Sequence, residues 1–268
     1  MVVDIEKIEE HLSKFNGREQ KLEMIKRYAK RSPMFYRTNN GIHSRRVARI
    51  TNEIIPFAEH VFGGDFNGPL ALAQAYVHDD PEIITGDIEV CTKKMMDLKE
   101  LVLKRSYELE AIGYFCQLYP ERVNGYKYHD LLDAAIEKVT KEAQVVSLAD
   151  KLDGFGEALH EVFAGNTVFM EGINGVAPPC VNYTKILSEF ERNFPLIIKL
   201  WDAYYGAHPA FTSPPPIESY NLADARPHTI DSIMKPSGHP QYESWKRVTI
   251  DNGWIGLLVT MTEHQKHL

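Results

Sequence analysis

Apolar residues recur at intervals of three and four positions along most of the first two hundred residues, which is the spacing of amphipathic helices. Runs in which apolar and polar residues alternate, the pattern of a half-buried strand, are missing. The spacing predicts helices over residues 4–15, 18–31, from His43 to the glycines at 63–64, 69–79, 93–118, 140–164 and 183–205. The pattern therefore predicts an all-α fold, a helical bundle.

Prolines and glycines mark the expected limits of these helices. Ser32-Pro33 is expected to end the second helix, and Pro69 suits a first helical turn. Pro56 is expected to kink or divide the helix that begins near His43. The segment FTSPPPIESYNLADARPH holds four prolines and cannot be regular helix. We therefore expect a helical domain over 1–208 and a Pro-rich, partly irregular appendage over 209–268, packed on that domain or on a partner subunit.

Composition narrows the class of protein. The chain has 268 residues, enough for one large domain, and a formal net charge of −7, which argues against general binding to nucleic acid or to an anionic membrane. Three scattered cysteines, Cys91, Cys116 and Cys180, form no CxxC pair and fit a reducing cytoplasm better than a disulfide framework. The first residues do not read as a signal peptide, and no apolar run is long enough to span a membrane. These features predict a cytoplasmic protein.

A histidine and an aspartate stand side by side, His78-Asp79, where an apolar helix is expected to end. Adjacent His and Asp side chains can bind one divalent cation, but two ligands do not hold a metal. His43 shares a predicted inward helix face with Val47 and Ile50, and Asp150 lies on the apolar face of a later helix. A buried aspartate is costly unless it is paired or bound to metal. The four residues His43, His78, Asp79 and Asp150 therefore predict one metal site.

Glu82 follows the His78-Asp79 pair by about one helical turn. Two histidines and two aspartates leave coordination positions open for water and a phosphate oxygen on Mn, Co, Fe, Mg or Zn. Glu82 would then be close enough to exchange a proton with that water or with a leaving oxygen. The pattern is therefore compatible with a metal site that activates water, although an acid in a first helical turn is also common for electrostatic reasons alone.

Three longer stretches resemble a known family. The order H…HD…D resembles the HD-domain metal-dependent phosphohydrolases, and HDDPEIITGD, VSLADKLDGFGEALHEVFAGN and RTNNGIHS are similar to segments of the YfbR-type 5'-deoxynucleotidases. The resemblance covers roughly residues 20–205. It implies a helical HD domain, a homodimer, and removal of the 5'-phosphate from deoxynucleoside monophosphates. It also implies that Glu82 handles protons, that Asp87 contacts the sugar or holds the site, and that Thr85 belongs to the substrate-binding turn.

The chain departs from this family before the first histidine, where members have an Arg-Trp pair that meets phosphate and helps to reject ribose. The best counterpart here is Arg31-Ser32, with Arg37 in reserve and Lys151 as a weaker candidate for the same positive charge. Preference for deoxyribose stays open because Ser32 replaces tryptophan. Two alternative functions also stay open: hydrolysis of a nucleoside triphosphate or cyclic nucleotide, and a non-catalytic HD module that binds nucleotide as a regulator.

Overall fold

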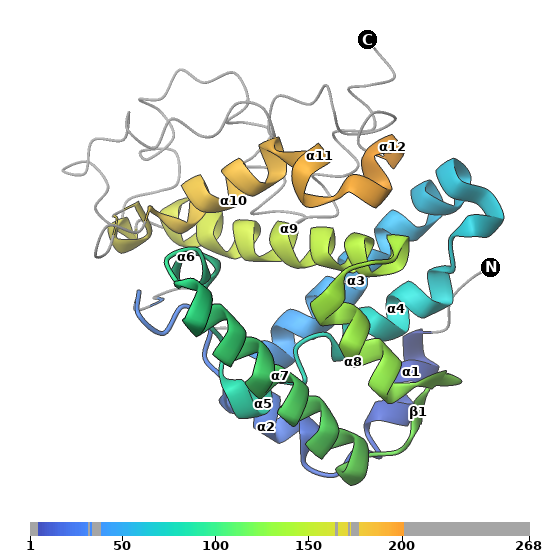
Figure 1. Ribbon diagram of the computed structural model, residues 1–268. Coiled ribbons are helices and arrows are strands. Elements are labelled where there is room, and N and C mark those ends of the chain that lie inside the picture. The colour runs from blue at the N-terminus through green and yellow to red at the C-terminus, as the bar shows by residue number, and fades with distance from the viewer. Residues whose placement is uncertain are drawn as a thin grey trace. The chain divides into compact units, whose positions relative to one another are not determined.

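Helices form nearly all the regular structure of the protein. The computed structural model describes residues 5–31, 33, 39–163, 166–170, 172 and 177–200, and for these the predicted all-α fold is confirmed (Figure 1). The α-helices are α1 (Ile5–Leu12), α2 (Arg18–Met24), α3 (Asn40–Phe62), α4 (Gly68–Val77), α5 (Glu82–Thr85), α6 (Val90–Lys93), α7 (Leu98–Leu118), α8 (Tyr128–Glu137), α9 (Lys141–Phe163), α10 (Pro179–Ser188), α11 (Phe190–Asn193) and α12 (Ile198–Leu200). The 3-10 helices are η1 (Gly63–Asp65), η2 (Thr167–Met170) and η3 (Pro195–Ile197). The appendage predicted over 209–268, and its boundary with the helical domain, lie outside the described residues.

The chain divides into two compact units. The first consists of Met1–Arg27 and Thr38–Asp150, and the second of Tyr28–Arg37 and Lys151–Leu268. The first unit contains α1 to α8 and the beginning of α9, and the second contains the rest of α9 together with η2, α10, α11, η3 and α12. Within the described ranges, no helix is both long enough and apolar enough to cross a lipid bilayer.

Helices α3 and α4 pack against each other in the core of the first unit. The residues predicted to face inward on α3, Val47 and Ile50 among them, are buried, and α4 is buried along almost its whole length. Gly68, at the start of α4, permits the close approach, because a Cβ there would lie 2.7 Å from Ile55 Cγ2. Pro69 occupies the first turn of α4 as predicted, whereas α3 continues through Pro56 without division.

The second predicted helix is shorter than expected. The apolar spacing predicted a helix over 18–31, but α2 ends at Met24, and Ile25 has the extended backbone angles φ −85° and ψ 106°. Lys26 then forms an isolated antiparallel bridge with Asn39, next to the first residue of α3. Pairing with a distant segment replaces the helical hydrogen bonds here, which helical periodicity cannot reveal.

The long helix predicted over 93–118 begins later, at Leu98. The side chain of Asp97 accepts a hydrogen bond from the backbone N–H of Glu100, and the side chain of Glu100 accepts one from the N–H of Asp97. This capping box starts a new helix. The residues before it form the separate short helix α6, which ends at Lys93.

A small β-hairpin was missed in the sequence. Strands β1 (Arg122–Val123) and β2 (Tyr126–Lys127) pair in antiparallel register around Asn124 and Gly125. Both turn residues have positive φ, 48° and 84°, as a two-residue hairpin turn requires. The Asn-Gly dipeptide was the signal for this turn.

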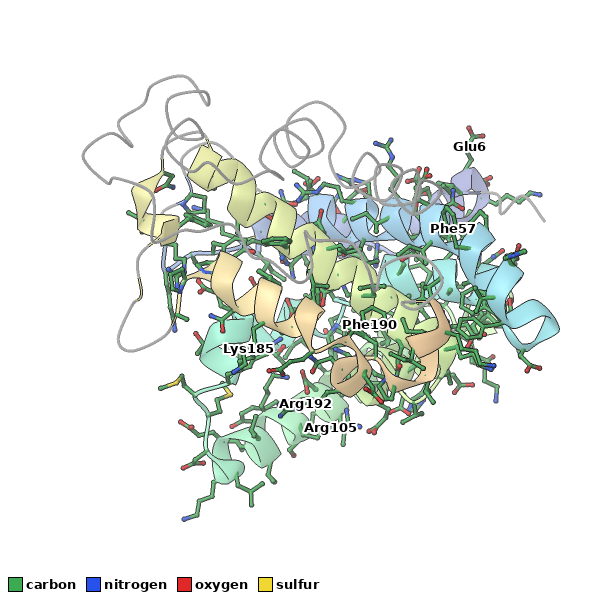
Figure 2. All side chains as sticks on the ribbon, turned by 90° about the horizontal axis from the view of Figure 1, so that it is seen from above. Glu6, Phe57, Arg105, Lys185, Phe190 and Arg192 are labelled. Carbon is green, nitrogen blue, oxygen red and sulfur yellow. The ribbon has the colours of Figure 1, made fainter. Side chains whose placement is uncertain are left out.

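Aromatic side chains fill the second unit. The hydroxyl of Tyr28 donates a hydrogen bond to the carbonyl oxygen of Gly154 at 2.6 Å, and the Tyr28 ring contacts Phe169 edge-on. Figure 2 shows Phe190 of α11, which is buried against Phe194, and also labels Lys185 and Arg192, which pair with Glu189 at the surface.

The single helix predicted over 183–205 is divided in the structure. It is replaced by α10, α11, η3 and α12, and residues 201–205 lie outside the described part of the chain. Pro195 begins η3 and has no backbone N–H to donate to the preceding turn. Pro195 therefore explains the break between α11 and η3, but not the earlier break at Glu189 between α10 and α11.

Candidate metal and catalytic site

His43 is positioned by the start of α3. The side chain of Asn39 accepts a hydrogen bond from the backbone N–H of Ile42 at 2.9 Å and so caps the helix. Because the helix starts there, His43 lies in the first turn on the same face as the buried Val47. The His43 side chain is completely buried.

The His78-Asp79 pair lies where α4 ends. Val77 is the last residue of α4 and His78 is its C-cap. The Nδ1 atom of His78 lies 2.7 Å from the carbonyl oxygen of Ala75, so we assign Nδ1 as the protonated nitrogen that donates to this oxygen. The other ring nitrogen, Nε2, then carries the lone pair that a metal requires.

The four residues proposed as ligands all belong to the first unit. Donor atoms of His43, His78 and Asp150 lie within 4.8 Å of one another. The Asp79 carboxylate lies beside both histidines, with Oδ2 3.4 Å from His43 Nε2 and Oδ1 3.3 Å from His78 Nε2. His43 Nε2 is also 3.3 Å from Asp150 Oδ1. Ligands that bind one cation at roughly 2 Å stand about 3–4 Å from each other, so the spacing suits a shared ion.

The chemistry of the cluster also fits a divalent cation. His78 Nε2 and Asp79 Oδ2 are buried, and no hydrogen-bond partner meets either atom among the residues that the structure describes. Burying polar atoms in this way costs free energy that a bound cation would recover. Imidazole nitrogen together with carboxylate oxygen is a donor set that several divalent metals accept.

The charge states of the cluster favour metal binding. Burial lowers the pKa of His78, and Asp79 and Asp150 oppose this shift only in part, so the imidazole is held in its neutral form. Burial would raise the pKa of Asp79, but His78, His43 and Arg27 together hold it below its ordinary value. Neutral imidazole and ionised carboxylate are the forms that bind metals.

Glu82 lies at the start of α5, directly after the turn that carries the His-Asp pair. Asn40 donates a hydrogen bond from Nδ2 to Glu82 Oε2 at 2.7 Å, and Lys93 Nζ lies 3.7 Å from Glu82 Oε1. Burial and the charge of Asp79 raise the pKa of Glu82 from 4.5 to about 8, although Lys93 opposes the shift. A carboxyl group with a pKa near neutrality can both accept and release a proton at physiological pH.

This raised pKa predicts how the metal-free protein responds to pH. Folded Glu82 keeps its proton up to about pH 8, whereas in the unfolded chain it loses the proton near 4.5. Its contribution to stability is therefore present below about pH 4.5 and is lost as the pH rises through 8. Urea unfolding in EDTA at several pH values, with wild type and Glu82→Gln, measures this. We expect the free energy of unfolding of wild type to fall relative to the variant over this range, and a constant difference would contradict it.

Asn40 and Lys93 were not recognised in the sequence as site residues. Asn40 was taken as part of the turn that precedes the His43 helix, and Lys93 as the first residue of a long helix. In the structure they approach the two oxygens of Glu82 from α3 and α6. A polar residue that is fully buried in a first helical turn, as Asn40 is, has no local signal in a single sequence.

Thr85 and Asp87 flank the turn after Glu82. The Thr85 hydroxyl lies 3.3 Å from the carbonyl oxygen of Pro81, to which it donates within α5. Gly86 has φ 74° and ψ 157°, a conformation that glycine adopts readily, and it ends the short helix. Asp87 follows and acts electrostatically on both Glu82 and Lys93. The substrate contacts predicted for Thr85 and Asp87 stay predictions.

The positive residues chosen from the sequence do not belong to the first unit. Arg31 and Lys151 are part of the second unit, and Arg37 lies outside the described residues. The Arg31 side chain is almost completely buried, with Nη1 3.5 Å from the carbonyl oxygen of Val168. Their proposed contacts with phosphate stay predictions.

A buried ion pair supports the turn that carries Asp79. Arg18 donates from Nε and Nη2 to the two oxygens of Asp80, at 2.7 Å each, and from Nη2 to the carbonyl oxygen of Tyr76 at 2.5 Å. The Tyr128 hydroxyl donates to Asp80 Oδ2 at 2.5 Å. Asp80 is completely buried and is the residue next to Asp79. The network therefore ties the turn to α2 and α8.

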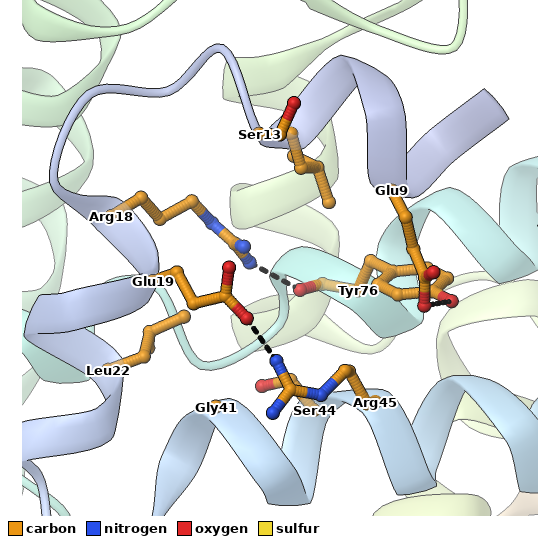
Figure 3. A pocket seen from close by; sticks show the side chains of 10 residues that line it. Glu9, Ser13, Arg18, Glu19, Leu22, Gly41, Ser44, Arg45 and Tyr76 are labelled. Carbon is orange, nitrogen blue, oxygen red and sulfur yellow. Dashed lines mark hydrogen bonds and ion pairs between the residues drawn. The ribbon is translucent and has the colours of Figure 1, made fainter. Parts of the chain in front are cut away.

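A pocket of about 460 Å³ is lined by residues of α1, α2, α3 and α4, Arg18 among them (Figure 3). The Arg45–Glu19 ion pair and the hydrogen bond from Tyr76 to Glu9 line it, and Arg18 forms part of its wall. None of the four proposed metal ligands lines this pocket. Its charged side chains all have partners, since Arg45 pairs with Glu19, Glu9 with Tyr76, and Arg18 with the buried Asp80.

Sequence comparison relates the chain to named nucleotidases. It is 28% identical over 135 residues to 5'-deoxynucleotidase VV1113 of Vibrio vulnificus (strain YJ016), and 28% identical over 137 residues to 5'-deoxynucleotidase YfbR of Salmonella typhi. The matched segments cover 49% and 50% of this chain. They cover 66% of each relative, slightly less than two thirds of its length.

A solved structure and a family sequence pattern also match this chain. The PH0347 protein from Pyrococcus horikoshii OT3 matches with a TM-score of 0.50 and 25% sequence identity, over 74% of this chain and 95% of that one. The sequence pattern of the family described as 5'-deoxynucleotidase YfbR-like matches residues 14–178, which is more than half of the chain and includes His43, His78, Asp79 and Asp150. The chain therefore belongs to the YfbR-like 5'-deoxynucleotidase family.

Proposed function

We propose that this protein is a metal-dependent phosphohydrolase that removes the 5'-phosphate from nucleoside or deoxynucleoside monophosphates. The observation that carries the proposal is the convergence of donor atoms from His43, His78 and Asp150 within 4.8 Å. Membership of the YfbR-like family and the names of the related 5'-deoxynucleotidases support a nucleotide 5'-phosphate as the substrate.

His43, His78, Asp79 and Asp150 would hold one divalent cation, which we propose to be Mn, Co, Fe, Mg or Zn. A cation in such a site supplies a Lewis acid that stabilises negative charge on phosphoryl oxygens and makes water more acidic. The residues themselves would provide the neutral imidazole of His78 and the ionised carboxylate of Asp79.

Glu82 would transfer the protons of the reaction. Water attacks the phosphorus atom, a new P–O bond forms, and the bond from phosphorus to the 5'-oxygen breaks to give a nucleoside and inorganic phosphate. The attacking water loses a proton and the leaving 5'-oxygen gains one. The Glu82 carboxyl group, held by Asn40 and with its pKa raised to about 8, is suited to accept the first proton and to donate the second.

Phosphate release from a panel of nucleotides tests the proposal. The full chain is incubated with Mn²⁺ or Co²⁺ and with deoxynucleoside monophosphates, ribonucleoside monophosphates, triphosphates and cyclic nucleotides. We expect release from monophosphates, loss of release in EDTA, and loss in His78→Ala and in Glu82→Gln. The ratio of the phosphate-release rates with dAMP and with AMP measures the preference for deoxyribose over ribose. This preference is of interest because Ser32 replaces the tryptophan of the family.

His60→Ala is the matched control, because His60 is an exposed histidine on the same chain, at the far end of α3. It should leave release unchanged. Turnover of triphosphates or cyclic nucleotides alone would replace the monophosphate proposal. Tight nucleotide binding without any turnover would identify a regulatory module instead. Sedimentation and cell fractionation test the further proposals of a homodimer and of a cytoplasmic location.

A further inference from the structure

The two oxygens of the Glu82 carboxylate meet different kinds of partner. Asn40 approaches Oε2 and Lys93 approaches Oε1, at 2.7 Å and 3.7 Å. The first distance is that of a good hydrogen bond, whereas the second is too long for one and is an electrostatic contact only. Asn40 therefore fixes the orientation of Glu82, and Lys93 is not needed for that purpose.

The position of Asn40 suits it to orient the Glu82 side chain. It is completely buried in the first turn of α3, and its Nδ2 group is directed at Glu82. An amide carries no charge and cannot attract a phosphate strongly. Its contribution is limited to positioning the neighbouring carboxyl group.

Lys93 has the opposite properties. About a third of its side chain, 35%, is exposed to solvent, and its ammonium group lies 3.7 Å from Glu82 Oε1. It lies in the field of four carboxylates, and although burial alone would lower its pKa, Glu82, Asp87, Asp150 and Asp79 raise the value. The ammonium group therefore stays charged at neutral pH.

A phosphate dianion that binds beside Glu82 needs positive charge nearby. The carboxylates around Lys93 would repel the substrate, and one divalent cation offsets only part of their charge. The arginines and the lysine selected from the sequence belong to the second unit or lie outside the described residues. Within the described part of the first unit, Lys93 is a cation in contact with Glu82 whose side chain is partly exposed.

We propose that Lys93 is a substrate-binding residue whose ammonium group leaves Glu82 and donates hydrogen bonds to the phosphate group of the substrate, while Asn40 keeps Glu82 in place. This inference rests on the proposed phosphohydrolase function. It adds a phosphate contact from α6 that the sequence motifs did not include.

Binding of inorganic phosphate to the full chain loaded with Mn²⁺, measured by calorimetry, tests the role of Lys93. Lys93→Met keeps the length of the side chain but removes its charge, and we expect phosphate affinity to fall about 10- to 100-fold, as for loss of a charged hydrogen bond. Lys93→Arg should keep most of the affinity. In steady-state assays, Lys93→Met should raise KM more than it lowers kcat.

Lys94→Met is the matched control, since it removes the same charge from the next, exposed position, and it should leave phosphate affinity unchanged. Asn40→Ala should lower kcat and leave phosphate affinity unchanged, as expected for a residue that acts through Glu82. Equal phosphate affinity in wild type and Lys93→Met overturns the inference, and so does a wild type that binds no phosphate. If wild type binds phosphate but turns over no nucleotide, the proposed function fails while the affinities still decide the role of Lys93.

Discussion

Replacing Asp150 with alanine is expected to slow phosphate release from nucleoside monophosphates by about a thousandfold or more. Asp150 Oδ1 lies 3.3 Å from His43 Nε2, within the cluster of donor atoms that would hold the cation. A Lewis acid supplies several kcal/mol of stabilisation to the transition state, and each ~1.4 kcal/mol is a factor of ten in rate. Initial rates of phosphate release with saturating Mn²⁺ measure the loss.

A second measurement separates loss of metal binding from loss of catalytic rate in Asp150→Ala. A ligand that binds only the folded state raises the unfolding temperature, and at a fixed ligand concentration the rise is larger for tighter binding. We expect Mn²⁺ to raise the Tm of wild type and not that of Asp150→Ala. The control is Asp133→Ala, an exposed aspartate on α8. A Tm that responds equally to Mn²⁺ in wild type and in Asp150→Ala would refute the assignment of Asp150 as a ligand.

Replacing Arg18 with methionine is expected to lower the free energy of unfolding by about 3–5 kcal/mol. The change leaves the Asp80 carboxylate buried without its cation, and removing one partner of a buried ion pair has a cost of this size. Asp80 is completely buried, and the Tyr128 hydroxyl alone would remain as its hydrogen-bond donor among the contacts described above. Urea unfolding of the metal-free protein measures the effect as a lower midpoint with an unchanged slope.

The ion pair between Arg45 and Glu19 provides the control, because it lines the same pocket but is exposed, with 42% and 55% of the two side chains accessible. Arg45→Met should cost less than about 1 kcal/mol, as exposed pairs do. The double variant Arg18→Met, Asp80→Leu should recover much of the loss, since no charge is then left buried. Equal costs for Arg18→Met and Arg45→Met would show that burial does not control the energy of the Arg18 pair.

The helical content of the protein was predictable because an amphipathic helix repeats its apolar positions locally. The periodicity located α3 and α7, and Pro69 correctly marked the first turn of α4. The errors concern helix ends, the missed hairpin of β1 and β2, and the division of the helix predicted over 183–205. Helix α2 ends at Met24 because Lys26 pairs with Asn39, and the capping box of Asp97 starts α7 later than the apolar pattern alone indicated.

For the candidate site, too, local patterns in the sequence were predictive and contacts between distant residues were not. The adjacent pair His78-Asp79 and the downstream Glu82 are a local pattern, because all three lie within five positions of the chain. His43 and Asp150 were proposed because each interrupts an apolar helix face. No comparable pattern marked Asn40 or Lys93, which approach Glu82 from 42 residues before it and from a separate short helix.

The sequence by itself determined the helical class of this protein and predicted a set of candidate metal ligands. Both depend on side-chain type and on spacing within one helix, which are local properties. Only the tertiary structure decided that the donor atoms of His43, His78 and Asp150 lie within 4.8 Å, and that Asn40 and Lys93 flank Glu82. These distances depend on how α3, α4, α6 and α9 pack, and packing is set by many weak contacts between residues far apart in the chain.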